Sequence, residues 1–289
     1  MKLALTKIRQ YLPDYTVLDE RPEWDADLSQ PLFFKGGEVG CITLHGIGGT
    51  PANIRCVADA LIAQGYTVVS PTLPGHGETV RALGASTDAQ WLQCIFDAYD
   101  RLRREGCTRI YALGLSLGGI LSSILAEERP LCGLVLLCAP VKMQRYLRFS
   151  RRISGLIPVI RYPEPKNPEN SARHNPYAQM YTGFCSAKLN DLNRLCLRLR
   201  RNLTRIQCPT LFFTAEYDDK VDPVSVGIFQ KGAVHVPSFT HVHLAHSPHG
   251  CTYGCEREDV AARCVDFVRR QEAALAEASA AGKPQQPNA

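Results

Sequence analysis

A serine enclosed by glycines, between a predicted strand and a predicted helix, constrains the fold of this chain more than any other feature. Residues 109–113 are short, apolar and rich in branched side chains, which predicts a buried strand. The sequence Gly-Leu-Ser-Leu-Gly follows at 114–118, and residues 119–128 predict a helix packed against a sheet. A strand that turns so sharply into a helix leaves no space for side chains beside the turn, which explains the glycines. We therefore expect the hydroxyl of Ser116 to be lifted clear of the sheet.

The rest of the chain alternates predicted strands with predicted helices. Strands are expected at residues 31–34, 39–44, 66–70, 134–138, 210–214 and 239–245. Helices are expected from a cap at Thr50 or Asn53 through Leu61, over residues 88–105, and over residues 256–275. This alternation predicts an α/β fold, with a mostly parallel sheet covered by helices on both faces. A length of 289 residues fits one large domain of this class.

The alternation stops after Pro140 and resumes near residue 206. Residues 141–205 contain helical patterns, prolines and arginines but no good strand pattern, which predicts an insertion above the carboxyl ends of the strands. The predicted organisation is an N-terminal arm (1–30), a core (31–140 and 206–275), a basic cap insertion (141–205) and a disordered tail (276–289).

The serine turn predicts nucleophilic chemistry if a base and a carboxylate are available to activate the hydroxyl. In this architecture the carboxylate and then the histidine follow the serine in the chain. Four carboxylates follow the strand at 210–214, and spacing alone leaves the choice open: Glu216, Asp218, Asp219 and Asp222. His249, after the last predicted strand, is the best-placed base, and His246 is the second candidate. His241 and His243 share one face of that strand and are expected at surface or core positions.

Four short motifs together resemble a known family. They are His-Gly-Ile-Gly-Gly at 45–49, Pro-Gly-His-Gly at 74–77, Gly-Leu-Ser-Leu-Gly-Gly at 114–119 and Cys-Ala-Pro at 138–140. From about residue 31 to 270, the chain resembles the microbial carboxylesterase and monoacylglycerol lipase branch of the α/β-hydrolases. The resemblance implies an α/β-hydrolase fold, with a mostly parallel central sheet, helices on both faces and a helical cap insertion.

The resemblance also selects among the candidate site residues. The acid loop of that branch has the form small-x-x-Asp-x-x-(Val/Ile)-x-Pro, which implies Asp218 rather than Asp219 as the acid. Its base loop has the form Ser-x-His, which implies His249, although Pro248 stands where the family commonly carries a small residue. The implied oxyanion donors are the backbone amides of Ile47 and Leu117.

The insertion is strongly basic. It holds fourteen Lys or Arg against three acidic residues, a net +11, so the rest of a chain of net charge +5 carries −6. Leucines at 192, 195, 199 and 203 alternate with arginines, which predicts a basic amphipathic helix. One interpretation is a leucine stripe facing the core with a solvated charged face. The other is a cap over an acyl pocket whose arginines make transient contact with lipid headgroups or anionic substrates. The arginines lack interleaved aromatic residues, and we expect no nucleic-acid partner.

Other features narrow the class of protein. The chain has no apolar run of membrane-spanning length and no secretory signal pattern, so its twelve cysteines predict reduced thiols in a cytoplasmic protein. The tract of histidines at 241, 243, 246 and 249 has only partly zinc-like spacing, and we expect neither a metal nor an organic cofactor. His45 and His76 are expected to have structural rather than catalytic roles.

These observations predict a serine hydrolase that cleaves carboxylic esters through an acyl-enzyme, with Ser116 as nucleophile, His249 as base and Asp218 as acid. Short-to-medium acyl esters or monoacylglycerols are the expected small-molecule substrates, and feruloyl or cinnamoyl esters are the alternative within the same chemistry. A hydrolase-like binding protein with little turnover is the alternative from another class. Neither the acyl length nor the oligomeric state follows from the sequence.

Overall fold

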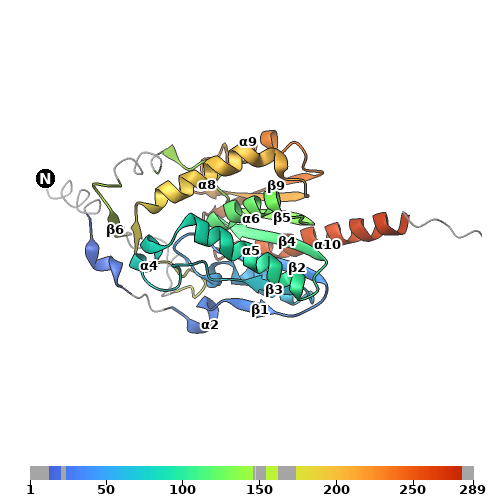
Figure 1. Cartoon of the computed structure of the whole chain (residues 1–289), viewed down its shortest axis with the longest axis horizontal. Coiled ribbons are helices and arrows are strands. Elements are labelled where there is room, and N and C mark those ends of the chain that lie inside the picture. The colour runs from blue at the N-terminus through green and yellow to red at the C-terminus, as the bar shows by residue number, and fades with distance from the viewer. Residues whose placement is uncertain (1–12, 21–23, 146, 148–153, 162–173, 282–289) are drawn as a thin grey trace, which may run out of the picture.

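A computed structural model describes residues 13–20, 24–145, 147, 154–161 and 174–281 of the chain, and its centre is a twisted sheet between two helical layers (Figure 1). The sheet has seven strands in the order β1-β3-β2-β4-β5-β8-β9. Their bounds are β1 Leu32–Phe34, β2 Val39–Leu44, β3 Thr67–Ser70, β4 Arg109–Leu115, β5 Gly133–Leu137, β8 Thr210–Tyr217 and β9 Phe239–Pro248. Only the β1–β3 pairing of this sheet is antiparallel, which confirms the mostly parallel sheet predicted from the alternation.

Alternate side chains of the central strands enter two separate hydrophobic cores. On β4, Ala112 packs in one core, while Tyr111 and Leu113 pack in the other. The first core is covered by α5 (Asp88–Arg104), α6 (Leu117–Glu128), α8 (Lys188–Asn202) and α9 (Ser225–Gly232). The second core is covered by α3 (Arg55–Ile62) and α10 (Arg257–Ala281). The central strands are therefore buried on both faces, as their continuous apolar runs require.

Several elements differ from the sequence-based expectations. Residues 141–205 contain two short strands, β6 (Val159–Arg161) and β7 (Gly183–Cys185), which pair with each other in antiparallel fashion. The expectation of no strand there was wrong, because three-residue strands are too short to produce a recognisable alternation. Four short helical elements were also not predicted: η1 Tyr15–Leu18, α2 Ala26–Ser29, α4 Val80–Ala85 and α9.

The last helix, α10, is longer than predicted. It continues to Ala281, so the first part of the segment expected to be a disordered tail is helical. Figure 1 shows its C-terminal turns extending beyond the sheet, and the described side chains at 273–279 are exposed. The stretch is rich in alanine and glutamate, and this intrinsic helix propensity outweighs the polar composition on which the tail prediction depended.

Helix α8 turns its leucines toward the protein core. Leu192, Leu195 and Leu199 are buried in the first core, which supports the leucine-stripe interpretation of this segment. The arginines face acidic side chains of the rest of the molecule: Arg198 Nη2 lies 3.0 Å from Glu128 Oε1 on α6. The basic insertion and the acidic core therefore neutralise each other along this contact.

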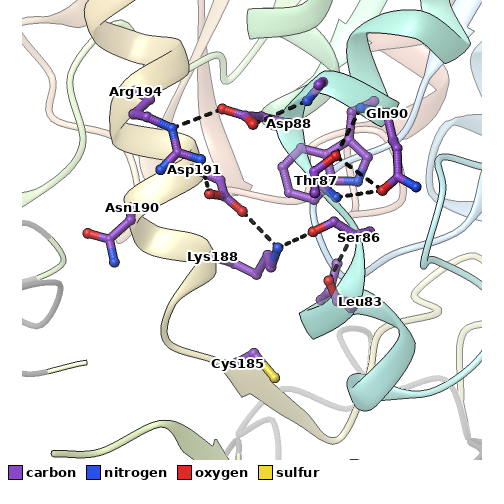
Figure 2. Close-up of polar contacts among 12 residues, drawn as sticks. Leu83, Ser86, Thr87, Asp88, Gln90, Cys185, Lys188, Asn190, Asp191 and Arg194 are labelled. Carbon is purple, nitrogen blue, oxygen red and sulfur yellow. Dashed lines mark hydrogen bonds and ion pairs between the residues drawn. The ribbon is translucent and has the colours of Figure 1, made fainter. Parts of the chain in front are cut away.

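The N-terminal end of α8 is fixed to the segment that precedes α5. Figure 2 shows Lys188 reaching toward Ser86 and Arg194 reaching toward Asp88, with Asp191 beside Lys188. Lys188 Nζ pairs with Asp191 at 2.7 Å and also donates a hydrogen bond to the Ser86 carbonyl, while Arg194 Nε lies 3.0 Å from Asp88 Oδ2. Lys188 and Asp191 are both nearly inaccessible to solvent, at 4% and 8% exposure. The Lys188–Ser86 hydrogen bond and the Arg194–Asp88 ion pair thus join the insertion to the core, and the buried Lys188–Asp191 pair within α8 orients the lysine for this contact.

Two further findings concern membrane spans and disulfides. Across the described ranges, no helix is long and apolar enough to cross a membrane. All twelve cysteines lie in the described part of the chain, and none of them forms a disulfide.

Candidate active site

The serine turn adopts the geometry that its glycines allow. Ser116 lies between β4 and α6 with φ 54° and ψ −114°, a left-handed conformation that is unusual for a residue with a side chain. A Cβ on Gly114 would lie 2.2 Å from the Gly118 carbonyl carbon, and a Cβ on Gly118 would lie 2.3 Å from the Leu44 carbonyl oxygen. Both positions therefore require glycine, and the backbone directs the serine side chain away from the sheet.

Ser116, His249 and Asp218 form a continuous hydrogen-bonded chain. The Nε2 atom of His249 lies 2.8 Å from Ser116 Oγ. Its Nδ1 atom lies 2.9 Å from Asp218 Oδ2 and 3.0 Å from Asp218 Oδ1. With the Nδ1 proton donated to the carboxylate, Nε2 is available to accept the serine proton, as nucleophilic catalysis requires. The structure thus brings together the three residues that the sequence motifs selected.

The surroundings of Asp218 keep its carboxylate ionised. Burial acts to raise its pKa, but the charge and hydrogen bond of His249, together with two backbone amides, hold the pKa below its ordinary value. These amides belong to Lys220 and Val221, at 2.8 and 3.0 Å from Oδ1. An ionised acid can both orient the imidazole and stabilise the imidazolium form.

The competing carboxylates and histidines have other partners. Asp219 pairs with Lys220 with its side chain 67% exposed, and Asp222 pairs with Lys142. Glu216 contacts the ring of His243. The rings of His243 and His241 both contact the Thr214 hydroxyl. His246 is exposed on β9. Within the described ranges, no three His, Cys, Asp or Glu side chains are arranged to hold a metal ion.

Two backbone amides border the serine. Leu117 is the first residue of α6, so its N–H has no carbonyl acceptor one turn earlier in the helix. The loop at 46–49 follows β2, and a Cβ on Gly46 would lie 3.4 Å from the Cβ of Ser116, which places this loop and the Ile47 amide beside the serine. Two amide donors beside a nucleophile can stabilise negative charge on a reacting carbonyl oxygen.

Both loop histidines have structural contacts. His45 Nδ1 donates to the Gly46 carbonyl at 2.8 Å, and its Nε2 accepts from the Leu73 amide at 3.1 Å. Burial lowers the pKa of His45 to about 4, so the ring is neutral and is fully engaged in supporting the loop. His76 Nδ1 contacts the Pro74 carbonyl at 3.2 Å, and burial lowers the pKa of His76 as well.

Cys138 is a core thiol that contacts the acid, and the sequence motifs did not predict this contact. It is buried directly after β5 with φ 47°, and its Sγ lies 3.6 Å from Cys251 Sγ. The Cys251 contact, burial and then the charge and hydrogen bond of Asp218 raise the pKa of the Cys138 thiol. Because β5 and β8 are neighbouring parallel strands, residues that follow their carboxyl ends lie side by side. Knowing that β5 and β8 are neighbours would therefore have been enough to predict the contact between Cys138 and Asp218.

A mostly apolar cavity of about 370 Å³ lies over Ser116 and His249. Its wall combines the serine turn and the loop at 46–47 with side chains of the insertion, among them Ile157, Ile160, Phe184, Leu189 and Leu192. A larger and more polar cleft of about 610 Å³ lies at the opposite end of α6, around Glu127 and Arg205. Ser116, His249 and Asp218 are not among its lining residues. The apolar cavity is therefore the candidate substrate site.

The known proteins that this chain resembles include a lipase, an esterase and a lipolytic enzyme. The chain is 30% identical over 245 residues to a thermostable monoacylglycerol lipase of Bacillus sp. (strain H-257), covering 84% of this chain and 95% of the relative. It is 29% identical over 209 residues to a carboxylesterase of Bacillus subtilis (strain 168), covering 69% of this chain and 80% of the relative. A solved structure from the metagenome-derived lipolytic enzymes LipS and LipT superposes with a TM-score of 0.75 at 23% identity, covering 84% of this chain and 98% of that one.

The family model described as "Alpha/beta hydrolase family" matches residues 41–263, which include the serine turn, the acid loop and the base loop. The chain belongs to the alpha/beta hydrolase family.

Proposed function

We propose that this protein is a serine hydrolase that cleaves carboxylic esters through an acyl-enzyme. The hydrogen-bonded chain of Ser116, His249 and Asp218, which opens onto an apolar cavity, carries this proposal. The two relatives named as a monoacylglycerol lipase and a carboxylesterase support the same chemistry.

The mechanism follows from the geometry. His249 Nε2, 2.8 Å from Ser116 Oγ, takes the hydroxyl proton as the oxygen attacks the ester carbonyl. The ionised Asp218 stabilises the resulting imidazolium, and the amides of Ile47 and Leu117 stabilise the oxyanion. His249 then donates the proton to the leaving alcohol. In the second half-reaction, His249 removes a proton from water, which attacks the acyl carbonyl, and the carboxylic acid leaves with Ser116 restored.

The lining of the cavity favours substrates with an aliphatic acyl group. Its insertion wall consists largely of branched aliphatic side chains and Phe184, which favours burial of a hydrocarbon chain over a polar group. We therefore propose medium-chain esters or monoacylglycerols as substrates. Contact of the insertion with a lipid surface remains a prediction, and the ion pairs of Arg161, Arg194 and Arg198 reduce the charge available for it.

The experiment combines active-site labelling with a substrate series. A fluorophosphonate probe is expected to label the wild type and not Ser116→Ala, and this substitution is expected to lower kcat by at least roughly 10³-fold. p-Nitrophenyl esters of increasing chain length are expected to reach the highest kcat/KM at medium length and to exceed methyl ferulate. Absence of wild-type labelling, or full labelling of Ser116→Ala, would contradict the proposal.

A further inference from the structure

A buried segment of the insertion contacts the loop that carries the Ile47 amide. Tyr181 N donates to the Gly48 carbonyl at 3.0 Å, and Gly49 forms an antiparallel β-bridge with Met180. Met180 and Tyr181 therefore lie against the loop at 46–49 through an isolated bridge. This arrangement fixes the loop from the insertion, in addition to the contact of the loop with the serine turn.

Two fully buried amide side chains, Asn53 and Gln179, hold this contact in place, and we call them the amide clamp. Asn53 Nδ2 donates to the carbonyls of Tyr177 at 2.7 Å and of Gln179 at 3.1 Å. Thr50 Oγ1 donates to Gln179 Oε1 at 2.9 Å. In all three hydrogen bonds, the segment that follows the loop donates and the insertion accepts.

The orientation of the Asn53 amide is determined by its neighbours. Its nitrogen faces two carbonyl oxygens, so the reversed orientation would place oxygen against oxygen. Its Oδ1 atom then lies against Gly49, where an added Cβ would approach it to 1.7 Å, and it has no hydrogen-bond donor among the described residues. Asn53 therefore packs directly on the loop while it holds the insertion.

The clamp also connects to the N-terminal arm and the base loop. Gln179 Nε2 donates to the Asp25 carbonyl at 3.3 Å, and the ring of Trp24 lies 5.3 Å from that of Tyr181. The Thr252 hydroxyl donates to the Asn53 carbonyl. The clamp residues are thus held by elements from both ends of the chain, and a buried amide with this many fixed partners restricts the loop to one position.

We infer that Gln179 and Asn53 are positioning residues for the oxyanion hole, and that the insertion sets the place of the Ile47 amide through them. The inference depends on the proposed function, because it assigns a role in stabilising an oxyanion. Asn53 lies on the wall of the cavity over Ser116, whereas Gln179 is not among its lining residues, so variants of Gln179 and of its partner Thr50 test the positioning role. Loss of the clamp should let the loop move, and the donor would then lie too far from the oxyanion to stabilise it fully.

The test uses Gln179→Met, which keeps the side-chain volume and removes its hydrogen bonds. We expect kcat to fall roughly 10- to 100-fold, and KM to change less than about twofold. The kcat loss should be smaller than the roughly 10²- to 10³-fold loss that follows deletion of an oxyanion donor, because the donor is displaced and not removed. The rate of fluorophosphonate labelling should fall by the same factor as kcat/KM. The acidic limb of the pH profile of kcat/KM should not shift, since the Asp218–His249 contact is untouched.

Three further variants make the result decisive. Thr50→Val removes the donor to Gln179 and also the acceptor for the Ala52 amide, and its kcat loss combined with that of Gln179→Met should be less than additive. Asn53→Asp should lower kcat more, because it places a carboxylate against two carbonyl oxygens. Gln64→Met, at an exposed glutamine just after the C-terminal end of α3, is the matched control and should behave as the wild type. Circular dichroism melts identify any variant that does not fold, and Thr50→Val then carries the test.

The outcomes distinguish failure of the proposed function from failure of the positioning role of the amide clamp. A wild type that neither hydrolyses esters nor reacts with the probe contradicts the proposed function. An active wild type with Gln179→Met and Thr50→Val at unchanged kcat overturns the inference alone. A kcat loss accompanied by a shifted pH profile also overturns it, because the base loop would then be the part that is disturbed.

Discussion

Asp218 and Asp219 are neighbours in the sequence but lie in different environments. The Asp218 side chain is 8% exposed and accepts hydrogen bonds from His249 and two backbone amides, whereas that of Asp219 is 67% exposed. The turn after β8 produces this difference, because its backbone amides point toward Asp218 Oδ1. Only a carboxylate held in this way can fix the tautomer of a histidine.

Asparagine substitutions at the two positions are expected to have very different effects. Asp218→Asn removes the charge that stabilises the imidazolium and favours the wrong tautomer, and kcat should fall by about 10³- to 10⁴-fold. Asp219→Asn should leave kcat within about twofold of the wild-type value, because Asp219 forms only an exposed ion pair with Lys220. Steady-state hydrolysis of a p-nitrophenyl ester measures both variants. A larger kcat loss in Asp219→Asn would reverse the choice of acid.

The site residues differ in how far they could be predicted from sequence. The serine and base candidates follow from local signals, a glycine-bounded turn and a histidine after the last strand, since local backbone geometry determines them. The acid could be selected only with the family pattern, because four carboxylates share its loop. The amide clamp could not be predicted, as its contact joins Asn53 and Gln179 across 126 residues of sequence.

At the scale of elements, α8 has two roles along its length. Its first turns contribute Leu189 and Leu192 to the cavity wall, while Leu199 and Arg198 farther along pack on α6. The leucine periodicity predicted a helix with a buried stripe, which the structure confirms. It could not predict which part of the stripe faces a cavity, because that depends on what lies opposite.

The buried ion pair of α8 should have a measurable effect on stability. Asp191→Leu leaves the Lys188 ammonium, whose side chain is 6% exposed, with the Ser86 carbonyl and the Trp91 ring, and is expected to lower the free energy of unfolding by about 3–5 kcal/mol. The double variant Lys188→Met/Asp191→Leu should be more stable than Asp191→Leu, because no uncompensated charge remains. Urea unfolding of both single variants and the double variant tests this. Additive losses would show that the pair is not coupled.

For the whole molecule, the mostly parallel sheet and its two helical layers follow from the alternating sequence pattern, whereas the fit between insertion and core depends on charge. Arg198 and Arg205 of the insertion both approach Glu128 at the end of α6. Such pairs are invisible to sequence periodicity, since they join segments far apart in the chain. They explain why a segment of net +11 coexists with a remainder of −6.

One member of this contact carries a pH dependence of stability. The Glu127 side chain is fully buried, its Oε2 lies 3.9 Å from Arg198 Nε and 3.4 Å from Asn202 Nδ2, and its Oε1 has no partner among the described residues. Burial raises its pKa to about 7 from an ordinary value of 4.5, although Arg198, Asn202 and Arg205 act to lower it and Glu128 acts to raise it. The folded state therefore holds a proton on Glu127 that the unfolded state releases at lower pH.

The sign of the effect follows from linkage. A carboxyl group whose folded pKa is raised gives stability that is fully present below pH 4.5 and is lost as the pH rises through about 7. This group alone should make folding less favourable by about 3 kcal/mol at pH 8 than at pH 4.5. Glu127→Gln removes the titration, so its stability advantage over the wild type should grow from pH 5 to pH 8.

Urea unfolding of wild type and Glu127→Gln at pH 5, 6, 7 and 8 measures that difference directly, since titration of the histidines is common to both proteins. The control is Glu128→Gln, which alters the neighbouring carboxylate, 31% exposed, that pairs with the same arginine. Glu128 is the last and smallest of the named influences on the pKa of Glu127, so the stability of Glu128→Gln should follow the wild type closely as the pH changes. If Glu127→Gln also runs parallel to the wild type, Glu127 is ionised in the folded state, and Arg198 compensates its burial across the whole range.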